Sequence, residues 1–159
     1  MVRGEVEKGF ASYKTTKELN PALHPGAHIK PEAYAHCMVG KMLANTHTLQ
    51  PSIDAQRRGD INQSLSILVA LKPQLLGVIE HFEKAIAINP GYTDALRDCG
   101  RVHEAIGLLT PNADGLPMLL EAVRLFGLAI KADPLHRDVR VRASNLHLQI
   151  AGGLERLGR

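Results

Sequence analysis

A nine-residue pattern occurs twice in this chain and constrains its fold more than any other feature. It reads F-x-x-A-I-x-x-N/D-P, and each position of the second copy follows its counterpart by 44 residues. The two copies consist of Phe82, Ala85, Ile86, Asn89 and Pro90, then Phe126, Ala129, Ile130, Asp133 and Pro134. The ring and the two residues three and four positions later share one helix face. Because Asn-Pro and Asp-Pro pairs end helices, the pattern predicts the second half of a two-helix repeat.

The segments that follow each copy extend this repeat. Apolar residues at helical spacing predict helices over 93–106 and 137–150. The order resembles the tetratricopeptide repeat, which is usually about 34 residues long and serves mostly as a binding scaffold. The extra length lies in Leu108–Pro117, which holds two prolines and a glycine and is expected to be a loop. Pro117 suits the first turn of the next helix.

The N-terminal half is predicted to be a less regular version of the same architecture. We expect helices over 2–19, from Pro31 to about Ala44, over Ile61–Leu71 with Asp60 as cap, and from Pro73 onward. Residues 20–31 and 45–59 are expected to form a connector and a loop. The fold is therefore predicted to be all-α, with about six or seven helices in stacked antiparallel pairs. One domain is expected over 1–159, with a degenerate repeat at about 5–72 and better ones at about 73–107 and 117–152.

Composition and charge narrow the classes of protein. Hydrophobic residues make up 45% of the chain, as in globular domains. No apolar run approaches the roughly 20 residues that a membrane helix needs, so no transmembrane segment is expected. The segment from Leu135 onward contains five arginines and two acidic residues, so its net charge is +3, the same as that of the whole chain. This basic segment leaves peripheral membrane association and RNA contact open, beside the simpler interpretation of a solvated helix face.

Four features together resemble one family. They are the expected helix closing on Asn20-Pro21, the helix end at Phe82–Pro90, the following turn and helix Asp94-Ala95-Leu96 with Gly100, and Leu109-Thr110-Pro111 before the helix that ends at Asp133-Pro134. Over roughly residues 5–150 the chain resembles the small presequence receptor of the plant and algal mitochondrial outer-membrane translocase. The resemblance implies a tetratricopeptide-like stack, a mitochondrial location and a basic amphipathic helix as ligand, lying in an apolar groove.

The chain departs from that family at one end. Such receptors carry a C-terminal hydrophobic anchor, whereas Gly152–Arg159 is too short and polar to span a bilayer. We therefore expect a non-catalytic interaction scaffold within a large mitochondrial assembly, with receptor-like ancestry, that binds protein subunits or peptide segments. The alternatives are a presequence-binding receptor and a cytoplasmic location.

The resemblance also implies which residues contact a partner, since the first helix of each pair lines the concave surface of such stacks. The candidates are Asp94, Arg97, Arg101 and Glu104 on one helix, and Asp138, Val141, Asn145 and Leu148 on the other. Arg97 and Arg101 share a face. They would repel a basic presequence and suit an acidic peptide or a C-terminal carboxylate. An ordinary solvated charged face is the alternative.

No catalytic motif is recognised, so no enzyme activity, cofactor or small-molecule substrate is expected. His103 and His147 occupy equivalent places in the two repeats and are interpreted as core residues. Cys37 and Cys99 lie at expected buried positions without a CxxC partner, so neither a disulfide framework nor a metal site is expected. Gly152-Gly153 is interpreted as a glycine pair that ends a helix.

Overall fold

The structure, a computed structural model, describes residues 4, 7–9, 11, 29–156 and 158. Over these residues it contains helices and no strand, which confirms the all-α prediction. The expected helix over 2–19 and most of the connector over 20–31 lie outside the described residues. The elements in chain order are α2 (Pro31–Thr46), α3 (Gln50–Arg57), α4 (Ile61–Ile88), α5 (Thr93–Leu109), the 3₁₀ turn η2 (Asn112–Gly115), α6 (Leu116–Ala132) and α7 (Arg137–Arg156).

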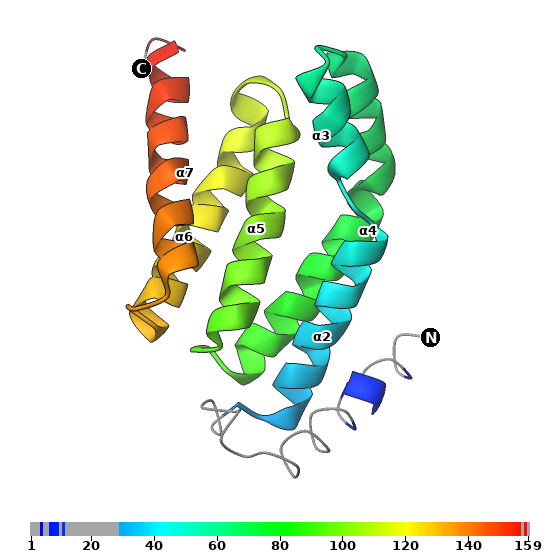
Figure 1. Cartoon of the computed structure of the whole chain (residues 1–159), viewed down its shortest axis with the longest axis vertical. Helices are drawn as coiled ribbons and strands as arrows, with labels where there is room; N and C mark the ends of the chain where they lie inside the picture. The colour runs from blue at the N-terminus through cyan, green and yellow to red at the C-terminus, as the bar shows by residue number, and fades with distance from the viewer. Residues whose placement is uncertain (1–3, 5–6, 10, 12–28, 157, 159) are drawn as a thin grey trace.

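Successive long helices run antiparallel and stack side by side (Figure 1). The most extensive packing joins α5 to α6 and α2 to α4, while α3 covers the N-terminal part of α4. α4 also packs against α5, and α6 against α7, so the pairs form one continuous stack of helices. The core runs through this stack and is built mainly from aliphatic side chains and two phenylalanines.

Each phenylalanine of the repeated pattern packs against a glycine on the partner helix. A Cβ placed on Gly40 of α2 would lie 2.8 Å from the ring of Phe82, and one on Gly100 of α5 would lie 2.6 Å from the ring of Phe126. Both rings are almost completely buried. Because glycine has no side chain, α2 can approach α4, and α5 can approach α6, closely enough for each phenylalanine ring to pack against the backbone of the partner helix.

The remaining pattern residues behave as helix spacing requires. Ala85 and Ala129 are fully buried, and the two isoleucines, Ile86 and Ile130, pack at the edge of the core. α4 ends at Ile88 and α6 ends at Ala132, so both helices stop directly before the Asn-Pro and Asp-Pro pairs at Pro90 and Pro134. These helix ends confirm the stop signals.

Residues 45–59 and 61–88 differ from the prediction. The expected loop contains α3, which begins beside a Thr48 hydroxyl that accepts the Gln50 N–H, and which buries Ser52 against α4. The Ser52 hydroxyl donates to the Ser64 carbonyl at 2.8 Å, so its burial leaves no unpaired polar atom. The sequence interpretation missed α3 because only Ser52 and Ala55 are buried among its mostly polar residues.

The two helices expected on either side of Pro73 are one helix. α4 runs through Pro73, whose ring faces solvent, and Asp60 caps its start by accepting the Gln63 N–H at 3.0 Å. A proline inside a helix removes one backbone hydrogen bond, which usually breaks or kinks the helix. Here α2 and α3 pack on opposite halves of α4, so tertiary contacts hold the helix continuous across that defect.

Two expectations about α7 were wrong. The helix continues through Gly152-Gly153 to Arg156, since Leu154 extends the partly buried stripe beyond Ile150. His103 is buried as expected, with its Nδ1 2.9 Å from the Cys99 carbonyl, but His147 is exposed. No described helix packs on the side of α7 where His147 lies.

The helix α4 is, over the described residues, long and apolar enough to cross a membrane by length and composition alone. It packs against α2, α3 and α5 and supplies Leu68, Leu75 and Phe82 to the core. Only 33% of its most apolar window is buried inside the structure, and Val69 and Leu76 on this helix are 63% and 49% exposed.

Candidate functional site

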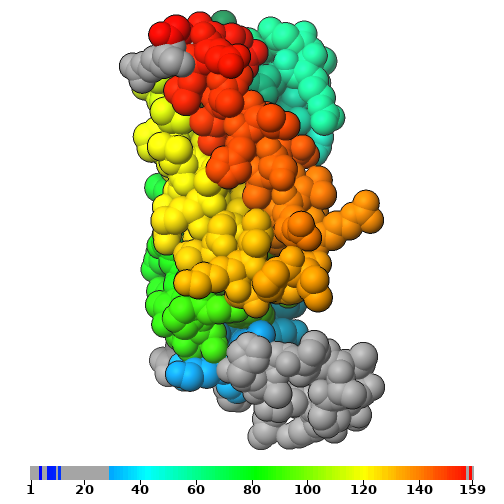
Figure 2. Space-filling model, turned by 90° about the vertical axis from the view of Figure 1, so that its left-hand side faces the viewer, coloured from blue at the N-terminus to red at the C-terminus, as the bar shows by residue number. Residues whose placement is uncertain are grey.

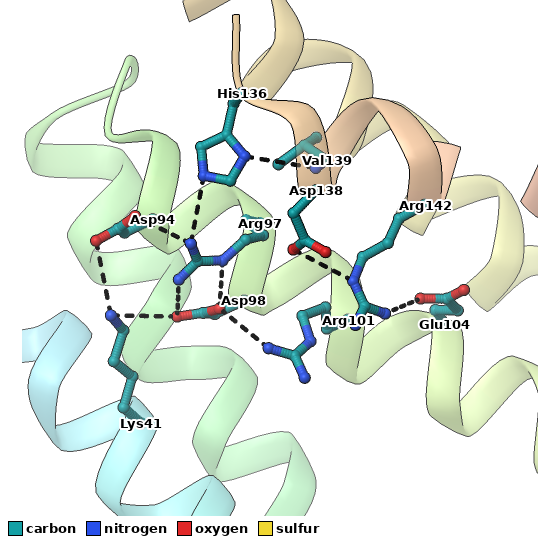
Figure 3. Close-up of polar contacts among 10 residues, drawn as sticks. All are labelled: Lys41, Asp94, Arg97, Asp98, Arg101, Glu104, His136, Asp138, Val139 and Arg142. Atoms are coloured by element: carbon teal, nitrogen blue, oxygen red, sulfur yellow. Dashed lines mark hydrogen bonds and ion pairs between the residues drawn. The ribbon is translucent and has the colours of Figure 1, made fainter. Parts of the chain in front are cut away.

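A chain of ion pairs crosses the face formed by α2, α5 and α7 (Figure 3). Its centre is Asp98 of α5, which is buried and was not among the residues chosen from the sequence. The Asp98 carboxylate accepts a hydrogen bond from Arg97 Nε at 2.9 Å. Lys41 of α2 lies 3.5 Å from the same carboxylate and 3.7 Å from that of Asp94. Asp98 thus links α2 to α5.

The same face is tied to α7 by a second group. Arg142 of α7 lies 3.5 Å from both Glu104 of α5 and Asp138 of its own helix. His136, at the start of α7, accepts the Val139 N–H and lies 3.4 Å from Arg97. The three helices that face this side are therefore joined by side-chain contacts as well as by the core.

These pairings decide which charges are available to a ligand. Burial by itself lowers the pKa of Arg97, but its hydrogen bonds to Asp98 and the nearby Asp94 outweigh that effect and raise it. Burial raises the pKa of Glu104, with Arg142 opposing the shift. Arg101 is 51% exposed, and its nearest carboxylate oxygen among the described residues, on Asp98, is 4.0 Å away. Arg97 is thus neutralised, whereas Arg101 keeps most of its donors free.

A pocket of about 430 Å³ opens beside this network, and we call it the α2–α5 pocket. It lies where α2 ends and the chain turns into α3, and it is lined there by residues 47–49, which belong to no helix. The buried part of its lining, which we call its floor, holds Leu49, Leu75, Phe82 and the carboxylate of Asp98, and its exposed rim includes Asn45, Thr48 and Arg101. The lining residues are Lys41, Ala44, Asn45, His47, Thr48, Leu49, Leu75, Phe82, Arg97, Asp98, Arg101, Val102 and Ala105.

The structure separates the residues chosen from the sequence into two groups. Arg97 and Arg101 line the α2–α5 pocket, with Asp94 and Glu104 beside them on α5. Val141, Asn145 and Leu148 lie on α7, away from that pocket. Asp98 could have been noticed in the sequence, because it lies four positions after Asp94 and three before Arg101, on the helix face that also carries Arg97.

The second group forms part of the outward face of α7, which no other described element covers (Figure 2). Val141 is 50% exposed and Leu148 is 72% exposed, on the side opposite the buried Val139, Ala143 and Leu146. A shallow depression there is lined by Arg137, Arg140, Val141, Ser144 and Asn145. This face combines apolar side chains with arginines.

The buried cysteines offer no reactive group. Burial raises the pKa of Cys37 to about 11 and that of Cys99 to about 12, so both are protonated thiols at neutral pH. Over the described part of the chain, no group of three or more His, Cys, Asp or Glu side chains is placed to hold a metal ion. The chemistry that the described residues offer at the pocket is ion pairing, hydrogen bonding and apolar contact.

Comparison with known protein families, curated proteins and solved structures found no match to this chain.

Proposed function

We propose that this protein is a non-catalytic scaffold that binds a peptide segment of a partner protein. The α2–α5 pocket carries the proposal. Its volume of about 430 Å³ is within the range of sites that hold small ligands or single side chains. Its floor reaches the core residues Leu75 and Phe82, and its rim carries Lys41 and Arg101. An apolar floor with a few fixed polar groups favours a specific ligand rather than general stickiness.

The outward face of α7 supports a place within a larger assembly. Exposed Val141 and Leu148 lie on one side of this helix, and a Cβ on Gly152 or Gly153 would meet no atom within 4 Å. A neighbouring subunit could approach the helix backbone closely there. The resemblance to the mitochondrial presequence receptor is the basis for proposing that the assembly is mitochondrial.

A receptor for basic presequences is the alternative. The apolar floor suits the apolar side of an amphipathic helix. The rim opposes it, because Lys41, Arg97 and Arg101 line the pocket against the single carboxylate of Asp98. The charge of the pocket therefore favours an acidic ligand group over a basic one.

The test is a gentle purification of the tagged full chain from its own cells, with native mass and composition measured. Two variants in adjacent positions serve as a matched pair. Asn45→Trp places a large ring at the pocket, which Asn45 lines, whereas Thr46→Trp places the same ring one residue away, outside the lining. Both positions are exposed, so neither change should cost much stability.

We expect the wild type and Thr46→Trp to purify with stoichiometric partners, and Asn45→Trp to lose at least one of them. Recovery of the wild type as a single chain would refute the scaffold. Equal recovery of partners with both variants would show that the α2–α5 pocket is not the contact. Basic presequence peptides displacing the partner would favour the receptor alternative.

A further inference from the structure

We infer that the outward face of α7 binds the same face of a second copy of this chain, with the two helices running antiparallel. This deepens the proposed function, because it names the neighbour that covers this helix as a second copy. Three observations lead to it: a straight stripe of exposed side chains, opposite charges placed symmetrically about its centre, and end charges that the stability of α7 does not explain.

Six exposed side chains form a straight stripe along the outward face of α7. They recur at alternating intervals of four and three residues, which keeps them within about 80° of one another around the helix. This is the spacing by which helices pair side by side in coiled coils. The stripe consists of Arg137, Val141, Ser144, Leu148, Ala151 and Glu155. No other described element covers this side of α7 (Figure 2).

The charges of the stripe are complementary to those of a second, antiparallel copy. Arg137 and Glu155 each lie nine positions from Leu146, in the middle of the stripe. In a symmetric pair, every contact between two different residues occurs twice. A twofold axis that crosses α7 at the level of Leu146 would therefore place Arg137 of each copy beside Glu155 of the other. Two ion pairs would close the two ends of the contact.

The positions between these charges also suit the arrangement. The same axis places Val141 beside Ala151 and Ser144 beside Leu148, so each large aliphatic side chain meets a small residue. Val141 is 50% exposed and Leu148 is 72% exposed, and pairing would remove both from water. Gly152 flanks the stripe, and a Cβ there would meet no atom within 4 Å, so a second helix can approach its backbone closely.

The two end charges are not explained by the stability of α7 itself. Arg137 is the first residue of this helix and Glu155 is the last but one. A helix is stabilised by negative side chains at its start and positive ones at its end, so both residues have the less favourable sign. Among the described residues, the ion pairs of α7 are formed by Arg142, with Asp138 and Glu104, and leave both end charges unpaired.

Other occupants fit the stripe less well. A parallel second copy would bring like charges together at both ends. An anionic membrane or a nucleic acid would attract Arg137 and Arg140 at one end, but it would be repelled by Glu155 at the other. The opposite charges at the two ends therefore favour an antiparallel copy of the same helix.

The experiment measures the mass of the purified full chain by sedimentation velocity over a series of concentrations. We expect the wild type to pass from monomer to dimer as the concentration rises, because the stripe is short and a small contact is weak. Arg137→Glu and Glu155→Arg should each weaken dimerisation at least about 10-fold, since each turns two attractive charge contacts into two repulsive ones. Arg137→Glu combined with Glu155→Arg should restore dimerisation, because the charges are exchanged but still opposite.

The variants also separate loss of contact from loss of structure. Glutamate at the start of α7 and arginine at its end both suit the helix dipole, so each single variant is expected to fold, which circular dichroism checks. Arg57→Glu is the matched control for net charge. Its side chain is 74% exposed at the end of α3, which packs on α4 and α5, so this change should leave dimerisation as in the wild type.

Four results would overturn the inference. A chain that stays monomeric up to millimolar concentration would leave the outward face of α7 to a different protein or surface. Undiminished dimerisation of both single variants would place the contact elsewhere, and a combined variant no better than the single ones would exclude the antiparallel arrangement. An equal loss with Arg57→Glu would trace the effect to net charge. None of these refutes the scaffold itself, which depends on whether Asn45→Trp releases a native partner.

Discussion

Replacing Gly100 by alanine should destabilise the packing of α5 on α6. A Cβ at this position would lie 2.6 Å and 2.8 Å from two atoms of the Phe126 ring, and real Cβ atoms essentially never approach closer than 3.0 Å. Phe126 is fully buried, so a ring that turns away has to displace neighbouring core side chains. Either the ring leaves its rotamer or the two helices separate by several tenths of an ångström.

The size of the effect follows from two opposing terms. Forcing one extra methyl group into a packed core costs about 1–3 kcal/mol. Alanine is favoured over glycine in a helix by about 1 kcal/mol. Gly127 of α6 isolates the second term, because it is exposed within the helix and a Cβ there meets nothing within 4 Å. Gly127→Ala should therefore stabilise the protein by up to about 1 kcal/mol.

The measurement is urea unfolding of the wild type and both variants, followed by circular dichroism at the helix band. The free energy of unfolding of Gly100→Ala should lie about 1–3 kcal/mol below that of Gly127→Ala, since the helix preference cancels in the comparison. Gly100→Ala combined with Phe126→Leu should recover part of the difference if the ring is the obstacle. Equal stabilisation by both glycine replacements would refute the close contact of α5 with the Phe126 ring.

Three further predictions concern stability. Phe126→Ala should lower the free energy of unfolding by about 3–5 kcal/mol in the same assay, and a loss well under 1 kcal/mol would contradict its core position. Asp98→Asn should cost about 1.5–3 kcal/mol, because Arg97 loses its charged partner. Glu121→Gln on α6 is its control, since the pair of Glu121 with Arg124 is largely exposed and is worth only about 0–1 kcal/mol; equal losses would show that Asp98 is not a structural hub. Burial, followed by Lys84, lowers the pKa of His36 below its ordinary 6.5, with Glu32 opposing, and His36 Nδ1 lies 3.2 Å from that of His81. The unfolded chain therefore binds more protons than the folded one just below pH 6.5, so stability should fall as the pH decreases through that range. His36→Asn should flatten this slope in urea titrations at several pH values, and an unchanged slope would exclude His36 as its source.

Several structural features could be predicted from local patterns. The ends of α4 and α6, the Asp60 cap and the position of Pro117 in the first turn of α6 all depend on residues close together in the chain. Local sterics and hydrogen bonding determine such features, so a sequence pattern is sufficient to find them. The glycines opposite the phenylalanines could not be assigned in this way. Gly40 and Phe82 are 42 positions apart, whereas Gly100 and Phe126 are 26 apart, so no single spacing joins them.

The candidate site shows a similar division. The sequence placed Arg97 and Arg101 on one helix face, because spacing along a helix determines which side chains are neighbours. It did not show that Arg97 is neutralised by Asp98 while Arg101 stays largely free, since Asp98 is ordered by Lys41 from another helix. Lys41 could not be connected with α5 because 57 positions separate it from Asp98 and no local pattern spans them.

The sequence by itself determined that this chain is helical, where two of its long helices stop, and which side chains share a face, because these depend on interactions within a few residues. The tertiary structure alone decided that α4 continues through Pro73, that residues 50–57 form a helix, and that a pocket opens where α2 gives way to α3. Those outcomes depend on packing between distant segments, where the contacts of α2 and α3 outweigh the local cost of one lost hydrogen bond.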